Sequence, residues 1–195
     1  MILKIVQAGE PVLRSAARAL TAEEVRSPSV QNLIELMRET MRDAPGVGLA
    51  APQIGLPLQL AVIEDRAELL AQMRPEVLAE RERRPVPFHV IVNPAIALGE
   101  EFAEFYEGCL SVTGFSAIVP RARTVHVDCM DQNGAPQSID AQGWYARILQ
   151  HEIDHLQGTL YTDRMLARSL TTGANLTRYW ERKDIEAVKR ELGMR

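Results

Sequence analysis

Residues 150–155 read Gln-His-Glu-Ile-Asp-His, an H-E-x-x-H sequence inside a segment of helical period. Four residues of an α-helix make about one turn and rise about 6 Å, so His151 and His155 project from one face. Two imidazoles at this spacing can bind one metal ion, and Glu152 is close enough to reach a water on that ion. An adjacent stripe of the same segment is apolar: Leu149, Ile153 and Leu156. We therefore predict a helix with one stripe in a core and the other facing a cavity.

Signals on either side of this motif predict the rest of the fold. The motif helix is expected from about Trp144 to Gly158, and an earlier helix from Ser27-Pro28 to Pro45-Gly46. Strands are expected over 58–63, 89–92 and 125–130, the last followed by an Asn133-Gly134 hairpin turn. We expect residues 64–88 to form a surface loop insertion with a helical turn over 67–73, and residues 174–193 to form a C-terminal helix. The predicted fold class is α+β: mostly antiparallel strands packed around a central metal-binding helix.

Length and charge narrow the class of protein further. A chain of 195 residues fits a single domain, 1–195, that buries a core without disulfides. The net charge of −4 gives no reason to expect specific nucleic-acid binding. We expect no membrane partner, since no apolar run approaches the length that spans a bilayer. No signal or transit peptide pattern is visible, which predicts a cytoplasmic protein with reduced thiols. Cys109 and Cys129 are then expected to be a ligand and a core residue, respectively.

Two histidines do not complete a catalytic metal site, which usually has three protein ligands and water. A third histidine six residues after His155 is excluded because position 161 is Tyr. Glu181, Asp184 and Glu186 are possible by distance, but pairing with nearby basic residues explains them without a metal. Cys109, in Glu107-Gly108-Cys109-Leu110-Ser111, is the better candidate, because a thiolate suits a site with two imidazoles.

Three motifs in order give the chain a strong resemblance to the peptide deformylase family. They are Gly46-Val47-Gly48-Leu49-Ala50-Ala51-Pro52-Gln53, Glu107-Gly108-Cys109-Leu110-Ser111 and Gln150-His151-Glu152-Ile153-Asp154-His155-Leu156. The similarity covers nearly the whole chain. The tract 111–115, with Val119-Pro120-Arg121 and Thr159-Leu160-Tyr161, resembles the branch that includes organellar deformylases. Without a transit peptide, a bacterial member is the simpler assignment.

The resemblance implies an activity and assigns roles to residues. It implies removal of the N-formyl group from formyl-methionine at the N-terminus of newly made proteins, with release of formate. Cys109, His151 and His155 are expected to bind one divalent metal, usually Fe²⁺, with Zn²⁺, Ni²⁺ or Co²⁺ able to substitute. Glu152 is the expected general base. The expected oxyanion donors are the side-chain amide of Gln53 and the backbone N–H of Leu110.

We also expect a substrate-binding surface and a transient ribosome encounter. The predicted substrate-binding residues are Val47, Gly48, Glu107, Gly108, Trp144 and Ile148. Two other hypotheses stay open from the residues alone: a zincin-like peptidase with Glu181 or Asp184 as third ligand, and a purely structural Cys-His-His site. A structural site usually closes all four positions with protein ligands, and no second Cys or His is near Cys109 in the sequence.

Overall fold

The computed structural model describes residues 1–194 and consists of two antiparallel sheets with helices on their faces. The strands are β1 Gly48–Ala50, β2 Leu60–Asp65, β3 Val86–Leu98, β4 Phe102–Cys109, β5 Val112–Ala122, β6 Thr124–Met130, β7 Pro136–Gln142 and β8 Thr171–Thr172. The α-helices are α1 Ala22–Arg26, α2 Pro28–Asp43, α3 Ala67–Leu70, α4 Pro75–Glu80, α5 Gly143–Leu156, α6 Gly173–Asn175 and α7 Ile185–Glu191.

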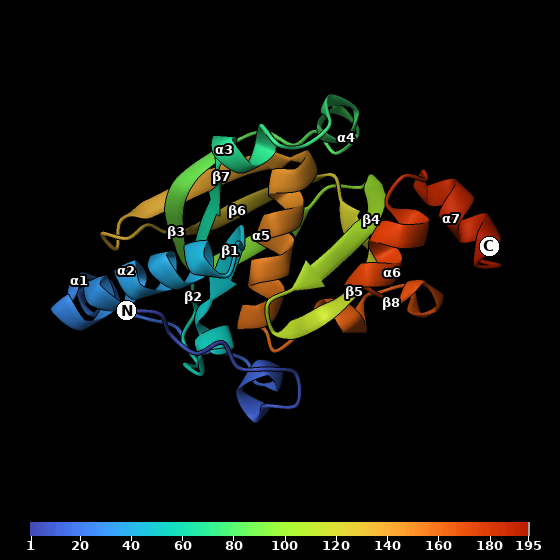
Figure 1. Ribbon diagram of the computed structural model, residues 1–195. Coiled ribbons are helices and arrows are strands. Elements are labelled where there is room, and N and C mark those ends of the chain that lie inside the picture. The colour runs from blue at the N-terminus through green and yellow to red at the C-terminus, as the bar shows by residue number, and fades with distance from the viewer. Residues whose placement is uncertain (195) are drawn as a thin grey trace.

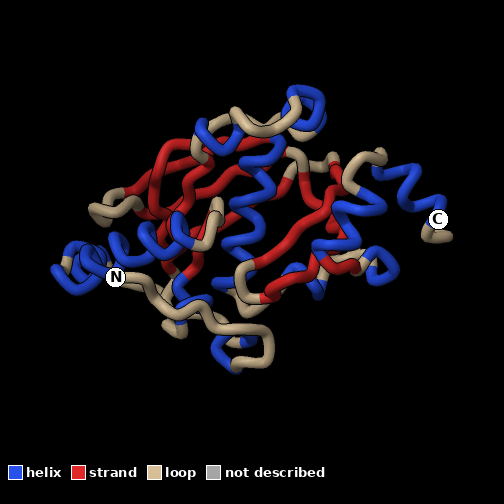
Figure 2. The backbone as a smooth tube through the Cα atoms, viewed as in Figure 1, coloured by secondary structure: helices blue, strands red, loops and turns tan. Residues whose placement is uncertain are grey.

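The larger sheet has the strand order β1-β2-β3-β6-β7, and the smaller one has the order β4-β5-β8. All the strand pairs in both sheets are antiparallel. Helix α5 lies between the two sheets and contacts strands of both (Figure 1). Figure 2 shows the same arrangement, with the strands on either side of this helix. The predicted α+β fold, with mostly antiparallel strands around the motif helix, is confirmed.

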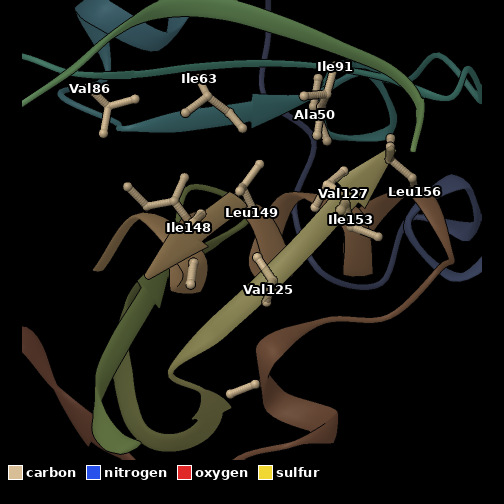
Figure 3. Packing of buried hydrophobic residues seen from close by; sticks show 14 residues of the cluster. Ala50, Ile63, Val86, Ile91, Val125, Val127, Ile148, Leu149, Ile153 and Leu156 are labelled. Carbon is tan, nitrogen blue, oxygen red and sulfur yellow. The ribbon is translucent and has the colours of Figure 1, made fainter. Parts of the chain in front are cut away.

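The larger sheet is covered on both faces, because neighbouring residues of a strand point to opposite sides. In β2, Ala61 and Ile63 pack with α5, whereas Leu60 and Val62 pack with α2. Figure 3 shows Ile63 and Ile91 facing Ile148, Leu149 and Ile153 of α5. The apolar stripe of the motif helix is therefore buried against this sheet, which fixes the helix and leaves its opposite face free for the site.

Local signals place the ends of the main elements where the sequence predicts them. Ser27 caps α2, with Pro28 at its first position. Helix α5 ends at Leu156, and Gly158 follows with a left-handed φ of 74°. Residues 131–135, which include Asn133-Gly134, join β6 to β7. Cys129 is partly buried against the main core, as its position among the valines predicts.

The structure corrects two expectations. Residues 64–88 are not one loop, because they include the end of β2, helix α4 and the start of β3; the helical turn expected over 67–73 is present as α3. Residues 174–193 are not one helix: a π-helical turn covers Leu176–Trp180, and α7 begins only at Ile185. Asp184 accepts a hydrogen bond from the backbone N–H of Ala187, so it starts a new helix where continuity was predicted.

Candidate active site

The H-E-x-x-H motif lies in the second half of α5, between the two sheets. Glu152 and His155 are almost fully buried, with exposed fractions of 3% and 1%. The rings of His151 and His155 are neighbours, with 5.0 Å between their centres. The helix therefore brings both imidazoles together, as the four-residue spacing predicts.

Cys109 approaches the two histidines from the smaller sheet. It is the last residue of β4, and its Sγ lies 3.3 Å from Nε2 of His155. The sulfur also accepts a hydrogen bond from Nε2 of Gln53 at 3.5 Å and one from the backbone N–H of Ser111 at 3.4 Å. Two N–H donors, one from a side chain and one from the backbone, are thus directed at the sulfur.

The three predicted ligands form one group. Ligand atoms of Cys109, His151 and His155 all lie within 4.8 Å of one another, and within residues 1–194 no other histidine, cysteine or carboxylate joins this group. Asp184 caps α7, so it is engaged elsewhere. The geometry supports Cys109 over Glu181 or Asp184 as the third ligand. It also leaves a fourth position without a protein ligand in this part of the chain, unlike a closed structural site.

The surroundings of the three side chains fit a bound divalent metal. Nδ1 of His151 lies 3.1 Å from Oε2 of Glu107, which leaves Nε2 of that ring available as a ligand. Oε2 of Glu152 is buried without a hydrogen-bond partner in the described structure. A thiolate and two imidazoles suit several first-row ions, and a water in the fourth position would give the Glu152 oxygen its missing partner.

Glu107 belongs to a buried ion-pair network. It accepts hydrogen bonds from Nε of Arg121 at 3.0 Å and from Nη1 of Arg147 at 2.6 Å, besides its contact with His151. Burial alone would raise the pKa of Glu107, but the contacts with His151 and Arg121 hold it well below its usual range. The carboxylate thus stays charged and fixes the orientation of the His151 ring.

Sequence reasoning missed the two arginines of this network. Arg147 is on α5, four residues before His151, and is only 4% exposed. Arg121 also bonds Asp154 at 2.5 Å, which ties β5 to the motif helix. An arginine one helical turn before a metal ligand was the signal available for Arg147, whereas nothing in the sequence indicates that Arg121 is buried.

Glu152 is held in an apolar, closely packed position beside β1. Burial raises the pKa of Glu152 to about 7, because the charged carboxylate loses its hydration. A side-chain carbon on Gly48 would lie 2.5 Å from Cδ of Glu152, closer than carbon atoms can pack. Gly48 is therefore required for the carboxylate to occupy its place next to the predicted metal ligands.

The two predicted oxyanion donors lie on either side of Cys109. Gln53 is 1% exposed, and its Oε1 accepts the backbone N–H of Ala50 at 2.8 Å, which turns its amide nitrogen toward the sulfur. Leu110 directly follows Cys109, and within residues 1–194 its backbone N–H makes no hydrogen bond. The Gln53 amide is thus directed at the Cys109 sulfur, and the Leu110 N–H is available to bind a substrate oxygen.

A cleft of about 430 Å³ opens beside these groups. All six residues predicted to bind substrate line it: Val47, Gly48, Glu107, Gly108, Trp144 and Ile148. Its wall also includes Arg81, Tyr106 and Phe115, none of which the sequence singled out. A larger hollow of about 660 Å³ lies over β3, β6 and β7, but it includes none of the predicted site residues.

The fold and the site define a class: an α+β domain in which a helical H-E-x-x-H and a strand-end cysteine form a candidate metal site. The polypeptide deformylase family model matches residues 2–170. The chain belongs to the polypeptide deformylase family.

Relatives and solved structures agree with this assignment. Chloroplastic peptide deformylase 1A of Solanum lycopersicum is 49% identical over 173 residues, which are 88% of this chain and 62% of that protein. Peptide deformylase 1 of Bifidobacterium longum is 47% identical over 180 residues, 92% of this chain and 80% of that one. The Met-Ala-Ser-bound class I type b peptide deformylase of Acinetobacter baumannii superposes with a TM-score of 0.75 at 31% identity, covering 85% of this chain and 99% of that chain.

The chain matches only part of the length of the two plant relatives. This chain spans 62% of the tomato protein and 65% of chloroplastic/mitochondrial peptide deformylase 1A of Arabidopsis thaliana. Both plant proteins carry organellar names, in line with the predicted resemblance to that branch. Among residues 1–194, no helix is both long and apolar enough to cross a bilayer.

Proposed function

We propose that this protein is a metal-dependent peptide deformylase, which hydrolyses the N-formyl amide of formyl-methionyl peptides and releases formate. The observation that carries the proposal is the convergence of Cys109, His151 and His155 beside the buried carboxylate of Glu152. Family membership supports the same reaction class. The Met-Ala-Ser peptide bound to the Acinetobacter enzyme supports a peptide substrate.

Cys109, His151 and His155 would hold the metal ion. Such an ion supplies Lewis-acid chemistry, because it makes water a nucleophile near neutral pH and polarises a carbonyl oxygen. We infer Fe²⁺ as the native ion, with Zn²⁺, Ni²⁺ or Co²⁺ able to substitute, since one thiolate and two imidazoles accept each of them.

Glu152 would carry the proton. Its carboxylate accepts a proton from the attacking water and returns it to the departing amine, so the formyl C–N bond breaks to give formate and a free N-terminus. A pKa near 7 matches a group that must both take and give a proton close to neutral pH. Its buried, unpartnered Oε2 supports this role rather than a structural ion pair.

Gln53 and Leu110 would stabilise the negative charge that develops on the formyl oxygen. Both donors belong to rigid segments, a buried 3-10 turn and the tight connection after β4, so they need little reorganisation during the reaction. Removing one such donor typically costs about 2.7–4 kcal/mol of transition-state stabilisation.

The methionine side chain would occupy the apolar part of the cleft. Val47, Trp144 and Ile148 form its walls, and Gly48 and Gly108 let a peptide backbone approach closely. The carboxylate of Glu107 is already bonded to Arg121, Arg147 and His151. Its contribution to substrate binding is therefore through the shape of the cleft and the orientation of His151.

We place the reaction in the cytoplasm, on nascent chains, which implies a transient encounter with the ribosome. The test is formate release from a formyl-Met-Ala-Ser peptide by protein prepared without oxygen and loaded separately with Fe²⁺, Co²⁺ or Ni²⁺. We expect formate with at least one ion and about a thousandfold less with Glu152→Gln, as for loss of a general base. No release with any of the three ions would overturn the proposal.

A further inference from the structure

Arg81 is the charged residue of the cleft wall that the proposed reaction leaves unexplained. It directly follows α4, within the segment 64–88. Its side chain lines the same cleft as Trp144 and Glu152. The other lining arginine, Arg147, is bonded to Glu107. Within residues 1–194, Arg81 forms no ion pair, and its Nε is buried without a hydrogen-bond partner.

The position of Arg81 is fixed by close packing. Gly143, the first residue of α5, has a left-handed φ of 60°, and a side chain there would lie 2.5 Å from Cβ of Glu82 and 3.0 Å from the carbonyl oxygen of Arg81. Residues 81 and 82 are thus seated on the start of the motif helix. The Arg81 guanidinium carbon lies 4.7 Å from the ring centre of Trp144 and 5.7 Å from that of Phe105. Two aromatic rings hold the charge in place.

Desolvation makes this position costly for an unpaired cation. Burial, together with the nearby charge of Arg83, lowers the pKa of Arg81, while Glu80 and Glu181 compensate in part from a distance. Arg83 itself is paired with Asp65. An arginine that is pre-positioned, partly dehydrated and without a carboxylate partner is suited to bind one from a ligand.

We propose that Arg81 is a specificity-determining residue that binds an acidic side chain at the second or third residue of the formyl peptide. The inference rests on the proposed deformylase function. The formylated N-terminus carries no charge, and a nascent chain has no free C-terminus, so Asp and Glu side chains are the carboxylates that such a substrate offers. Binding should act mainly on KM, because Arg81 is at the cleft wall and not among the reacting groups.

The test compares acidic peptides with their amide isosteres. The peptides are formyl-Met-Asp-Ser, formyl-Met-Asn-Ser, formyl-Met-Ala-Asp and formyl-Met-Ala-Asn, all amidated at the C-terminus so that no terminal carboxylate competes. For the wild type we expect kcat/KM to favour Asp over Asn about fivefold at one of the two positions, as for a partly exposed ion pair. The preference should lie in KM. It should decline as salt is raised from 50 to 500 mM, because the distance over which salt screens charges is about 10 Å at 0.1 M and shortens as salt increases.

Two variants separate direct contact from overall charge. Arg81→Gln should bring the Asp/Asn ratio close to one, whereas Arg84→Gln, which removes the same charge from an exposed neighbour, should keep the wild-type ratio. A wild-type ratio of one at both positions would overturn the inference, as would an unchanged ratio in Arg81→Gln or an equal loss in both variants. Formate release from the two Asn peptides reports the proposed function separately. The wild-type ratio and its salt dependence remain informative even if Arg81→Gln folds poorly.

Discussion

Replacing Gly48 with alanine should remove activity by displacing the catalytic carboxylate while leaving the metal ligands intact. The new methyl carbon would lie 2.5 Å from Cδ of Glu152 and closer still to Oε1. Ordinary van der Waals contact begins near 3.4 Å, so the carboxylate must retreat by about 1 Å. Glu152 is only 3% exposed, and it cannot swing into solvent to make that room.

The expected loss follows from this displacement. A 1 Å misplacement of a reacting group can cost about a hundredfold in rate, so we expect kcat of Gly48→Ala to fall by roughly that factor. Metal content per chain should stay at the wild-type level, because the three atoms nearest to the added methyl all belong to Glu152 and none to Cys109, His151 or His155. The assay is formate release under saturating formyl peptide, with metal content and thermal unfolding measured on the same preparations.

A matched control is available in Gly173, where an added methyl meets nothing within 4 Å. Gly173→Ala should keep kcat within about twofold of the wild type. If Gly48→Ala retained more than a third of the wild-type kcat, the placement of Glu152 against β1 would be refuted. If its kcat fell only in proportion to lost metal, the reasoning would fail too, because the loss would then arise in the ligands and not in the proton carrier.

Three further changes test the buried ion-pair network, one predicted metal ligand and a separate ion pair between α2 and β2. Glu107→Gln leaves buried positive charge uncompensated, so it should lower the free energy of unfolding by about 3–5 kcal/mol in urea denaturation; a loss under 1 kcal/mol would contradict the ion-pair network. Cys109→Ser should lower bound metal at least tenfold by elemental analysis, and full retention would exclude Cys109 as a ligand. Arg42 holds the pKa of Glu64 below its usual value, so this pair should stabilise the fold above about pH 5 and lose its effect as pH falls through the lowered pKa. Arg42→Gln should therefore be less stable than the wild type at pH 7, by under about 1 kcal/mol, and the two should converge once the pH is below the lowered pKa of Glu64.

Short-range signals account for the part of the fold that was predicted correctly. Capping by Ser27 and Pro28, the glycine after α5 and the Asn133-Gly134 turn each act within a few residues, so their outcome does not depend on distant packing. The four-residue spacing of His151 and His155 is equally local. The motif helix and its two histidine ligands could therefore be predicted from the sequence alone.

Features set by distant packing were not predictable in the same way. Strand β3 extends over thirteen residues, although only 89–92 were expected, because Asn93 takes a left-handed φ of 51° and the register shifts between Val92 and Ala95. The side chain of Asn93 bonds both the N–H and the carbonyl of Leu20, a partner 73 residues away. That bulge lets one strand continue past Pro94, where a local reading of the sequence ends it.

The position of Arg81 in the cleft is likewise set by distant packing and could not be predicted from the sequence. Residues 80–84 mix two glutamates with three arginines and lie in the segment 64–88, which the sequence predicts to be a surface loop. In the structure Gly143 admits the backbone of residues 81 and 82 onto α5, and the arginine reaches the cleft over Trp144. A charged segment therefore became part of the cleft wall through a glycine 62 positions after Arg81, a relation that no spacing rule describes.

The two histidines of the motif are not equivalent, although the motif treats them as a pair. Nδ1 of His151 is fixed by Glu107, whose carboxylate is in turn held by Arg121 and Arg147. Nδ1 of His155 is buried without a partner in the described structure, and this ring contacts Cys109 through Nε2. Hydrogen bonds thus orient one ligand in advance, whereas packing and the sulfur orient the other. The smaller sheet supplies the partners on both sides, Glu107 and Cys109 from β4 and Arg121 from β5. The docking of α5 between the two sheets is accordingly what completes the site, since the helix alone carries only two ligands and the proton carrier.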